Sequence, residues 1–154
     1  MQEIKQIKVE DIESKHKSEH EGYEYYKKEV VTGENSKQCK VSIYEIPPGK
    51  SAYPYHYHIK NEEIFYIIKG SGELITPSGI RQVSPGDFLF FPANEKGAHK
   101  LTNNSDDMLV YIDFDTENDI DIAFYPESNK VGVFGLGINQ IYKTEDRVDY
   151  YKDE

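Results

Sequence analysis

Turn-forming residues divide most of this sequence into short segments. Glycine and proline gather at 47–49, 70–72, 77–79 and 84–86, and the segments between them are rich in β-branched and aromatic residues. Because these residues interrupt both helices and central strands, each segment has room for one short strand. No sustained helical period runs through this region. The pattern therefore predicts an all-β barrel or sandwich.

Histidine and glutamate side chains provide a candidate metal-binding set. His56 and His58 are two positions apart, so an extended strand places both side chains on one face. Glu63 opens the next predicted strand, and His99 follows far downstream. Three imidazoles and one carboxylate suit a divalent transition metal such as Mn, Fe, Co, Ni, Cu or Zn.

The spacing around these residues resembles the two signature motifs of the cupin superfamily. The family patterns are G-x5-H-x-H-x3or4-E-x6-G and G-x5-P-x-G-x2-H-x3-N, and this chain contains Gly49-x6-His56-x-His58-x4-Glu63-x6-Gly70 and Gly86-x5-Pro92-x4-Gly97-x-His99-x3-Asn103. The first gap is one residue longer than usual. Asn94 stands where the second pattern has glycine, and asparagine tolerates the left-handed backbone that a turn there could need.

This resemblance implies a single-domain double-stranded β-helix, the jelly-roll or cupin barrel, with a C-terminal extension. It also implies that His56, His58, Glu63 and His99 hold one metal ion near the mouth of the barrel. We expect an N-terminal polar segment at 1–22, the barrel at 23–116, and an extension at 117–154 that packs on the barrel or on a dimer partner.

Strand parity predicts which side chains surround the metal. The predicted barrel strands span 23–32, 40–46, 53–58, 62–69, 73–76, 80–83, 87–91, 100–102 and 108–116. Phe65, Ile67 and Leu101 share the metal's face and would line a mostly apolar pocket. Residues 87–91 are nearly all apolar, as in a strand buried on both faces. Asp113 and Arg81 are polar residues of predicted strands that could face the cavity, and of the two positions the solvated outer face is the expected one.

The two ends of the chain give weaker patterns. Residues 10–21 have few apolar side chains and predict a loop or a frayed turn, with His16 and His20 at the surface. Residues 131–138 are apolar and glycine-rich but lack the order of a phosphate-binding loop. They are expected to pack on the barrel. The alternatives are that they form a lid over the metal cavity or join a dimer interface. Residues 144–151 predict a short helix capped by Thr144.

Composition limits the classes of partner. The chain has 154 residues, 30% of them charged, with a net charge of −10 and no basic cluster, which argues against nucleic-acid binding. The longest apolar run is far too short for a membrane span. The first residues lack the apolar core of a signal peptide, and the single cysteine, Cys39, allows no internal disulfide. We therefore expect a cytoplasmic protein, with Cys39 a packed strand residue.

The cupin resemblance implies several functions that the sequence alone leaves open. The first is a metal-dependent enzyme, a dioxygenase, isomerase or decarboxylase, that uses the metal as a Lewis acid or to activate oxygen on a small organic molecule. The alternatives are a non-catalytic module that binds or senses a small ligand, and a purely structural metal site. A cupin-type phosphoglucose isomerase is similar in motif spacing, but no basic cluster lies near the motifs to bind a phosphate. The resemblance also implies a homodimer, since single-domain cupins commonly pair, and an aromatic-rich outer strand face that needs covering agrees with this.

The first prediction concerns pH. If histidines hold the ion, bound metal should leave the protein as the pH falls below about 6, because protons then compete for the imidazole nitrogens. Equilibrium dialysis followed by metal analysis measures the loss. Bound metal that does not fall at any acidic pH at which the protein stays folded would contradict histidine ligation.

Overall fold

The structure is a computed structural model that describes residues 3–154, and within that range the strands form antiparallel sheets. The largest sheet contains, in spatial order, β1 (Ser14–His20), β2 (Tyr23–Val31), β3 (Cys39–Ile46), β10 (Leu109–Thr116), β5 (Glu63–Lys69) and β8 (Phe88–Phe91). A second sheet contains β13 (Ile138–Lys143), β12 (Lys130–Gly135), β11 (Ile120–Tyr125) and β4 (Tyr57–His58). A third contains β7 (Gly79–Val83), β6 (Gly72–Thr76) and β9 (Lys100–Thr102).

The sheets enclose one apolar core, and the fold is the predicted double-stranded β-helix. Alternate side chains of β5 and β10 point inward, as the pleat of a strand requires. The most deeply buried of the large apolar side chains are Ile46, Ile67, Leu109 and Tyr111. Gly70 ends β5 with a φ of +79°, and a side chain there would meet the carbonyl oxygen of Met108 at 2.4 Å. Only glycine fits this turn.

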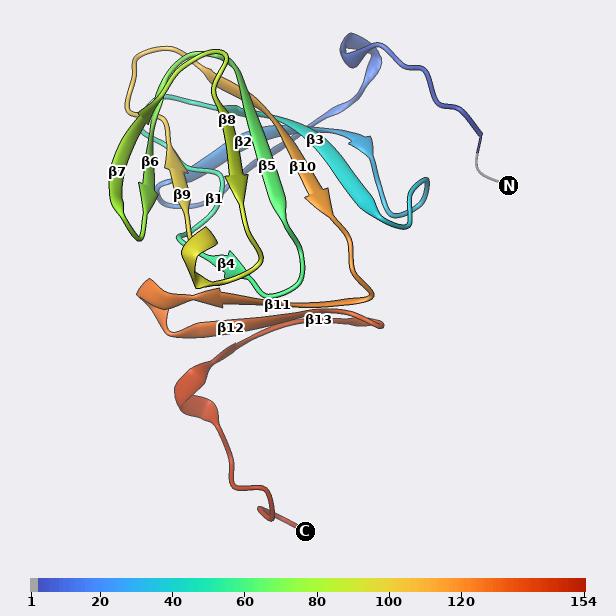
Figure 1. The fold of residues 1–154 in the computed structure, drawn as a ribbon, viewed down its shortest axis with the longest axis vertical. Helices are drawn as coiled ribbons and strands as arrows, with labels where there is room; N and C mark the ends of the chain where they lie inside the picture. The colour runs from blue at the N-terminus through green and yellow to red at the C-terminus, as the bar shows by residue number, and fades with distance from the viewer. Residues whose placement is uncertain (1–2) are drawn as a thin grey trace.

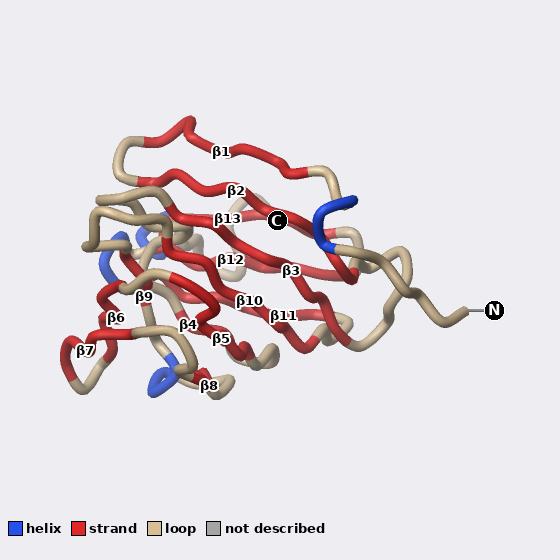
Figure 2. The backbone as a smooth tube through the Cα atoms, turned by 90° about the horizontal axis from the view of Figure 1, so that it is seen from above, coloured by secondary structure: helices blue, strands red, loops and turns tan. Residues whose placement is uncertain are grey.

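The C-terminal sheet closes one end of the barrel. In Figure 1, β11, β12 and β13 run crosswise beneath the ends of β5, β8 and β10, and the last residues extend away from the barrel. Figure 2 shows β1 at the outer margin of the large sheet, next to β2. Pairing of Ala123 with His58 and of Phe124 with Tyr57 attaches β11 to β4. The segment 117–154 is thus joined by strand pairing to one of the histidine-bearing segments.

The prediction for the N-terminal segment was wrong. Residues 10–21 do not form a loop; they contain the end of a 3₁₀ turn, η1 (Val9–Asp11), and the whole of β1. Every residue of β1 is exposed, so no apolar alternation marks it in the sequence. Backbone pairing with β2 makes the strand, and its basic residues Lys15, His16 and Lys17 suit an edge strand. His16 is at the surface as expected, stacked on Tyr26.

Two barrel strands also differ from their predictions. Regular pairing in the segment 53–58 is confined to β4, because Pro54 has no amide hydrogen to donate to a ladder. β8 is not buried on both faces: the side chains of Phe88 and Phe90 are 72% and 58% exposed. Their outward direction follows from alternation, which sends only Leu89 and Phe91 toward the interior.

The C-terminal segment contains strands rather than a terminal helix. The apolar run 131–138 forms β12, a turn, and the start of β13. The predicted helix at 144–151 is reduced to one 3₁₀ turn, η4 (Thr144–Asp146), and its N-cap is Lys143, not Thr144. This turn buries no side chain, so no packing supports a longer helix. The remaining 3₁₀ turns are η2 (Glu95–Gly97) and η3 (Pro126–Ser128).

Candidate metal centre

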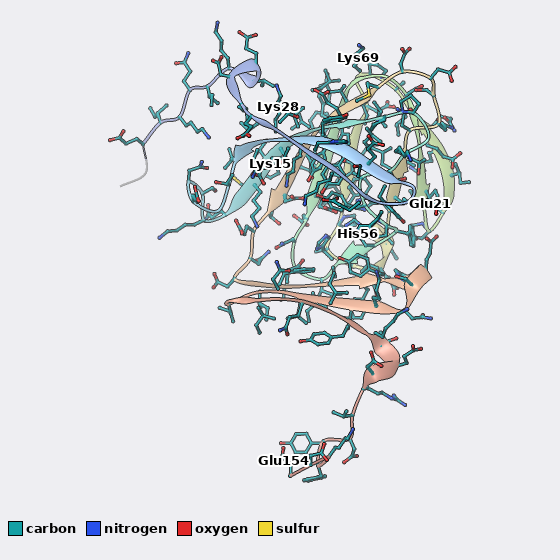
Figure 3. All side chains as sticks on the ribbon, turned by 180° about the vertical axis from the view of Figure 1, so that it is seen from behind. Lys15, Glu21, Lys28, His56, Lys69 and Glu154 are labelled. Carbon is teal, nitrogen blue, oxygen red and sulfur yellow. The ribbon has the colours of Figure 1, made fainter. Side chains whose placement is uncertain are left out.

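Backbone pairing brings the two histidine motifs together. The amide of His56 donates to the carbonyl oxygen of His99 at 3.1 Å, and the amide of His99 donates to the carbonyl oxygen of His56 at 2.9 Å. Their rings lie 4.9 Å apart between centroids. His58 follows on β4, and Glu63 is the first residue of β5. Figure 3 shows His56 where the barrel meets the C-terminal sheet.

The imidazole Nε2 atoms converge on one carboxylate. Nε2 of His99 lies 3.3 Å from Oε2 of Glu63, and Nε2 of His56 lies 3.9 Å from the same oxygen. Nε2 of His58 lies 3.7 Å from Oε1 of Glu63. Ligand atoms bound at about 2.1 Å to one ion stand about 3–4 Å from one another, so this spacing suits a shared metal.

Each Nδ1 atom is already engaged. Nδ1 of His56 donates to the carbonyl oxygen of Pro54 at 2.8 Å, and Nδ1 of His99 donates to that of Gly97 at 2.9 Å. Nδ1 of His58 donates to Oδ2 of Asp121. With the proton on Nδ1, each Nε2 carries a free lone pair, which is the tautomer that metal ligation requires.

Burial and protonation also favour a cation here. His99 is 2% exposed, and its Nε2 has no hydrogen-bond partner among the described residues. Burial, reinforced by His58, lowers the pKa of His56 to about 4, and burial holds the pKa of His99 well below its usual range. Both rings are therefore neutral at pH 7, and protons compete for their nitrogens only at a lower pH than the sequence predicts. Burial raises the pKa of Glu63 to about 8, so a bound cation would stabilise its ionised form. One ligand atom each of His56, His58 and Glu63 lies within 4.8 Å of the others, so these three donors fit a metal ion. Nε2 of His99 stands next to the same carboxylate.

The turn before His99 is held by a tight approach of two backbone segments. A side chain at position 97 would lie 2.1 Å from the carbonyl oxygen of Pro92, so glycine is required there. Asn94 does not adopt the left-handed backbone expected of it: its φ is −166°, and its side chain accepts the amide of Lys96 to cap η2. Asn94 therefore replaces the family glycine as a capping residue.

A cavity of about 450 Å³ opens onto three of the four candidate metal ligands, His56, His58 and Glu63. Its walls combine aromatic and acidic side chains, among them Tyr44, Tyr53, Asp113, Asp115 and Tyr125. The C-terminal segment contributes Phe134 and Ile138, so the run 131–138 borders the cavity. Lys27 and Lys40 also line it, although each is paired with a glutamate, Lys27 with Glu29 at 3.5 Å and Lys40 with Glu117 at 2.6 Å.

The residues predicted to line the pocket occupy a different layer. Phe65, Ile67 and Leu101 are buried in the apolar core, and they are not among the residues lining the 450 Å³ cavity. Phe65 packs edge-on against the ring of His99, with 5.4 Å between the ring centroids. Arg81 is exposed as expected, but the prediction for Asp113 was wrong, since this side chain is buried and faces the cavity.

Sequence reasoning missed the residues that orient the ligands and form the polar wall. Asp121 holds Nδ1 of His58, and its Oδ1 accepts the amides of Lys60 and Asn61 at 2.9 and 3.2 Å. The alternation of acidic and apolar residues at 111–115 was the available signal for Asp113 and Asp115. For Asp113, the common rule that aspartates face solvent predicts the wrong face, because this side chain is buried.

Comparison with known proteins agrees with this geometry. Residues 42–115 match the family model described as Cupin domain. That range contains all four candidate metal ligands. It begins within β3 and ends within β10. Residues 42–115 therefore belong to a small domain of the cupin superfamily.

Solved structures match over a longer range than the family model. A candidate sugar phosphate isomerase from Acidithiobacillus ferrooxidans is 24% identical, with a TM-score of 0.81 over 92% of this chain and 91% of that one. A sugar phosphate isomerase of the cupin superfamily from Silicibacter pomeroyi is 18% identical, with a TM-score of 0.83 over 96% and 98%. The polyketide cyclase RemF from Streptomyces resistomycificus is 19% identical, with a TM-score of 0.63 over 74% and 80%. These similarities establish the shared fold.

No curated protein matches this chain. Over residues 3–154, no helix has the length and apolar character needed to cross a membrane.

The hydrogen bond from His58 to Asp121 generates a prediction about metal affinity. Asp121→Asn should weaken metal binding about 10- to 100-fold, because the amide orients His58 less strongly and adds no basicity. A competition titration with a chromophoric chelator measures the change. Asp119→Asn, which alters an exposed neighbour, is the matched control. Equal affinity in the Asp121 variant and the wild type would rule out the orienting role.

The buried acids generate a prediction about the metal-free protein. Burial raises the pKa of Glu63 to about 8 and also raises the pKa values of Asp113 and Asp115. The folded state then binds more protons than the unfolded state, so the free energy of unfolding should fall by on the order of 1–2 kcal/mol between about pH 6.5 and pH 8. The lowered pKa values of His56 and His99 act in the opposite direction, but only below about pH 6.5.

Urea unfolding of chelator-treated protein measures this dependence. A free energy of unfolding that stays constant or rises over the same interval would show that the acids are not held as the structure places them.

Proposed function

We propose that this protein is a metal-dependent enzyme that acts on a small hydroxy-carbonyl compound, a sugar being the favoured class, and that it catalyses isomerisation. The observation that carries the proposal is the convergence of three imidazole Nε2 atoms on Glu63 at the base of a cavity, with Nε2 of His99 lacking any other partner. His56, His58, Glu63 and His99 would hold the ion. A bound ion of this class supplies Lewis acidity toward a carbonyl oxygen.

The cavity walls suit a polyhydroxylated ligand. Tyr44, Tyr53 and Tyr125 present aromatic surface against which the C–H faces of a small ring or chain can pack. Asp113 and Asp115 supply carboxyl oxygens that can accept hydrogen bonds from hydroxyl groups. A volume of about 450 Å³ is within the range of small-molecule sites.

The share of this chain that each solved structure matches favours isomerisation over the other cupin reactions. The two structures named as sugar phosphate isomerases match more than nine-tenths of this chain, whereas the polyketide cyclase matches 74% of it. The longer match takes in the C-terminal sheet that borders the cavity. A phosphate on the substrate is the less favoured form, because both lysines lining the cavity are already paired with glutamates.

The test is solvent exchange at carbon. Protein loaded with Mn²⁺, Fe²⁺, Co²⁺, Ni²⁺ or Zn²⁺ is incubated with a panel of sugars and sugar phosphates in D₂O and followed by proton NMR. We expect deuterium to enter the carbon next to the carbonyl, together with aldose–ketose conversion. The exchange should be lost in His99→Ala and retained in His16→Ala, which changes a histidine on the exposed strand β1.

Failure of exchange with every metal and every compound would contradict the isomerase proposal. Saturable binding of one compound without exchange would instead support the non-catalytic ligand-binding alternative.

We further propose that the protein forms a homodimer through the outer face of the large sheet. That face carries an apolar groove of about 350 Å³ lined by Ile64, Tyr66, Phe88, Ile112 and Phe114, with no polar atom exposed in its wall. Phe90 is exposed beside it on the same edge strand. A second copy of this face would cover these side chains.

Substitution at the edge strand tests the dimer. Burying one phenylalanine side chain contributes about 1.5–3 kcal/mol, so Phe88→Lys should raise the dimer dissociation constant by a factor of about ten or more. Light scattering coupled to size exclusion measures the mass. Ile80→Lys, at an exposed residue of β7, is the control. A wild-type protein that is monomeric at high concentration would contradict the proposal.

A further inference from the structure

A second group of possible metal ligands lies beside the histidine site. It contains Glu63 of β5 and two residues of β10, Asp113 and Asp115. Asp115 is directly opposite Glu63 in the strand pairing, and Asp113 is opposite Phe65, so all three acids point into the barrel. One carboxylate oxygen from each lies within 4.8 Å of the others.

The charge of this group is only partly offset by the protein, through His58 near Glu63 and the more distant Lys27. Asp113 is only 5% exposed, and its Oδ1 atom has no hydrogen-bond partner among residues 3–154. Oδ1 of Asp115 also lacks one within the same range. The lysines that line the cavity are held by Glu29 and Glu117. Unpaired carboxylates in so buried a place require a neutralising ligand, either protons or a cation.

The position of the free oxygens makes this group accessible to a cation. The free oxygens of Asp113 and Asp115 belong to side chains that line the same cavity as His56 and His58. A divalent ion bound there would be reached from solvent through that cavity. Its remaining coordination positions would face the space proposed for the substrate.

We propose that Glu63, Asp113 and Asp115 bind a second divalent cation, and that Glu63 is shared with the ion held by the histidines. The oxygen-only ligand set suits a hard cation such as Mg²⁺ or Mn²⁺, whereas the histidine-rich set suits a later transition metal. The proposal rests on the proposed histidine site only for the sharing of Glu63. In the proposed reaction, a second ion would bind further oxygens of the hydroxy-carbonyl substrate.

Mn²⁺ is the probe that tests this inference, because it binds both oxygen and imidazole ligands and is paramagnetic. Metal-free full-length protein is titrated with Mn²⁺ up to about 1 mM, and bound metal is counted by equilibrium dialysis and native mass spectrometry. We expect two equivalents. Electron paramagnetic resonance should show a six-line signal that broadens and weakens as the second site fills, since ions that share a carboxylate couple magnetically.

Variants separate the two sites. Asp113→Asn/Asp115→Asn keeps the side-chain volumes and should bind one equivalent, with an uncoupled six-line signal. Asp106→Asn/Asp107→Asn removes the same charge from an exposed loop and should still bind two. Circular dichroism checks that each variant is folded. If the first double variant does not fold, the stoichiometry and magnetic coupling of the wild type decide the question.

A single equivalent in the wild type, or two coupled ions in the Asp113/Asp115 variant, would overturn the inference. The histidine site would survive the first outcome if His99→Ala abolished that single ion. Absence of Mn²⁺ from the wild type would overturn both, because the histidine site also accepts this ion. One equivalent together with uptake of protons by the acidic group would assign the neutralising role to protons.

Discussion

The orientation of three imidazole rings is the constraint on which the rest of this site depends. Each ring is held through Nδ1, by the carbonyl oxygens of Pro54 and Gly97 and by the carboxylate of Asp121. Two of these acceptors are backbone atoms two residues before the histidine they hold, so the local turn sets both the tautomer and the direction of the ring. The arrangement leaves three Nε2 lone pairs pointing at Glu63, which is an electrostatically unfavourable cluster unless a cation joins it.

The barrel provides the rigidity that such a cluster needs. Aromatic packing surrounds the most deeply buried histidine, with the ring of Phe91 stacked 3.6 Å from that of His99 and the ring of Phe65 behind it. β10 lies between β3 and β5 and carries Tyr111, Asp113 and Asp115 on one face. A single strand therefore continues from the apolar core into the polar wall of the cavity. That continuity explains how acidic side chains are held where solvation is poor.

The C-terminal segment is part of the site rather than an accessory to the barrel. β11 pairs with β4, and the same strand places Asp121 against His58. The neighbouring strands bring Phe134 and Ile138 to the border of the cavity. Residues 117–154 thus contribute to the orientation of a candidate ligand and to the shape of the binding space.

The motif residues could be located from sequence because local rules govern them. The spacing of glycine, histidine and glutamate at 49–70 and 86–103 reflects turns and strand parity, and the structure brings His56, His58, Glu63 and His99 together. β1 and Asp121 could not be found this way. β1 is fully exposed and carries no apolar pattern, and Asp121 acts across 63 residues of chain on His58. Asp113 was assigned to the wrong face because its burial depends on neighbours in β3 and β5.

The central claim is that the imidazole Nε2 atoms and Glu63 hold a metal ion. Elemental analysis of untagged protein by inductively coupled plasma mass spectrometry, with His99→Ala purified in parallel, tests it most directly. The account predicts about one or more equivalents of a divalent transition metal in the wild type and a strong loss in the folded variant. No metal in the wild type after exposure to Mn²⁺, Fe²⁺, Co²⁺, Ni²⁺, Cu²⁺ and Zn²⁺, or equal metal in both proteins, would contradict it.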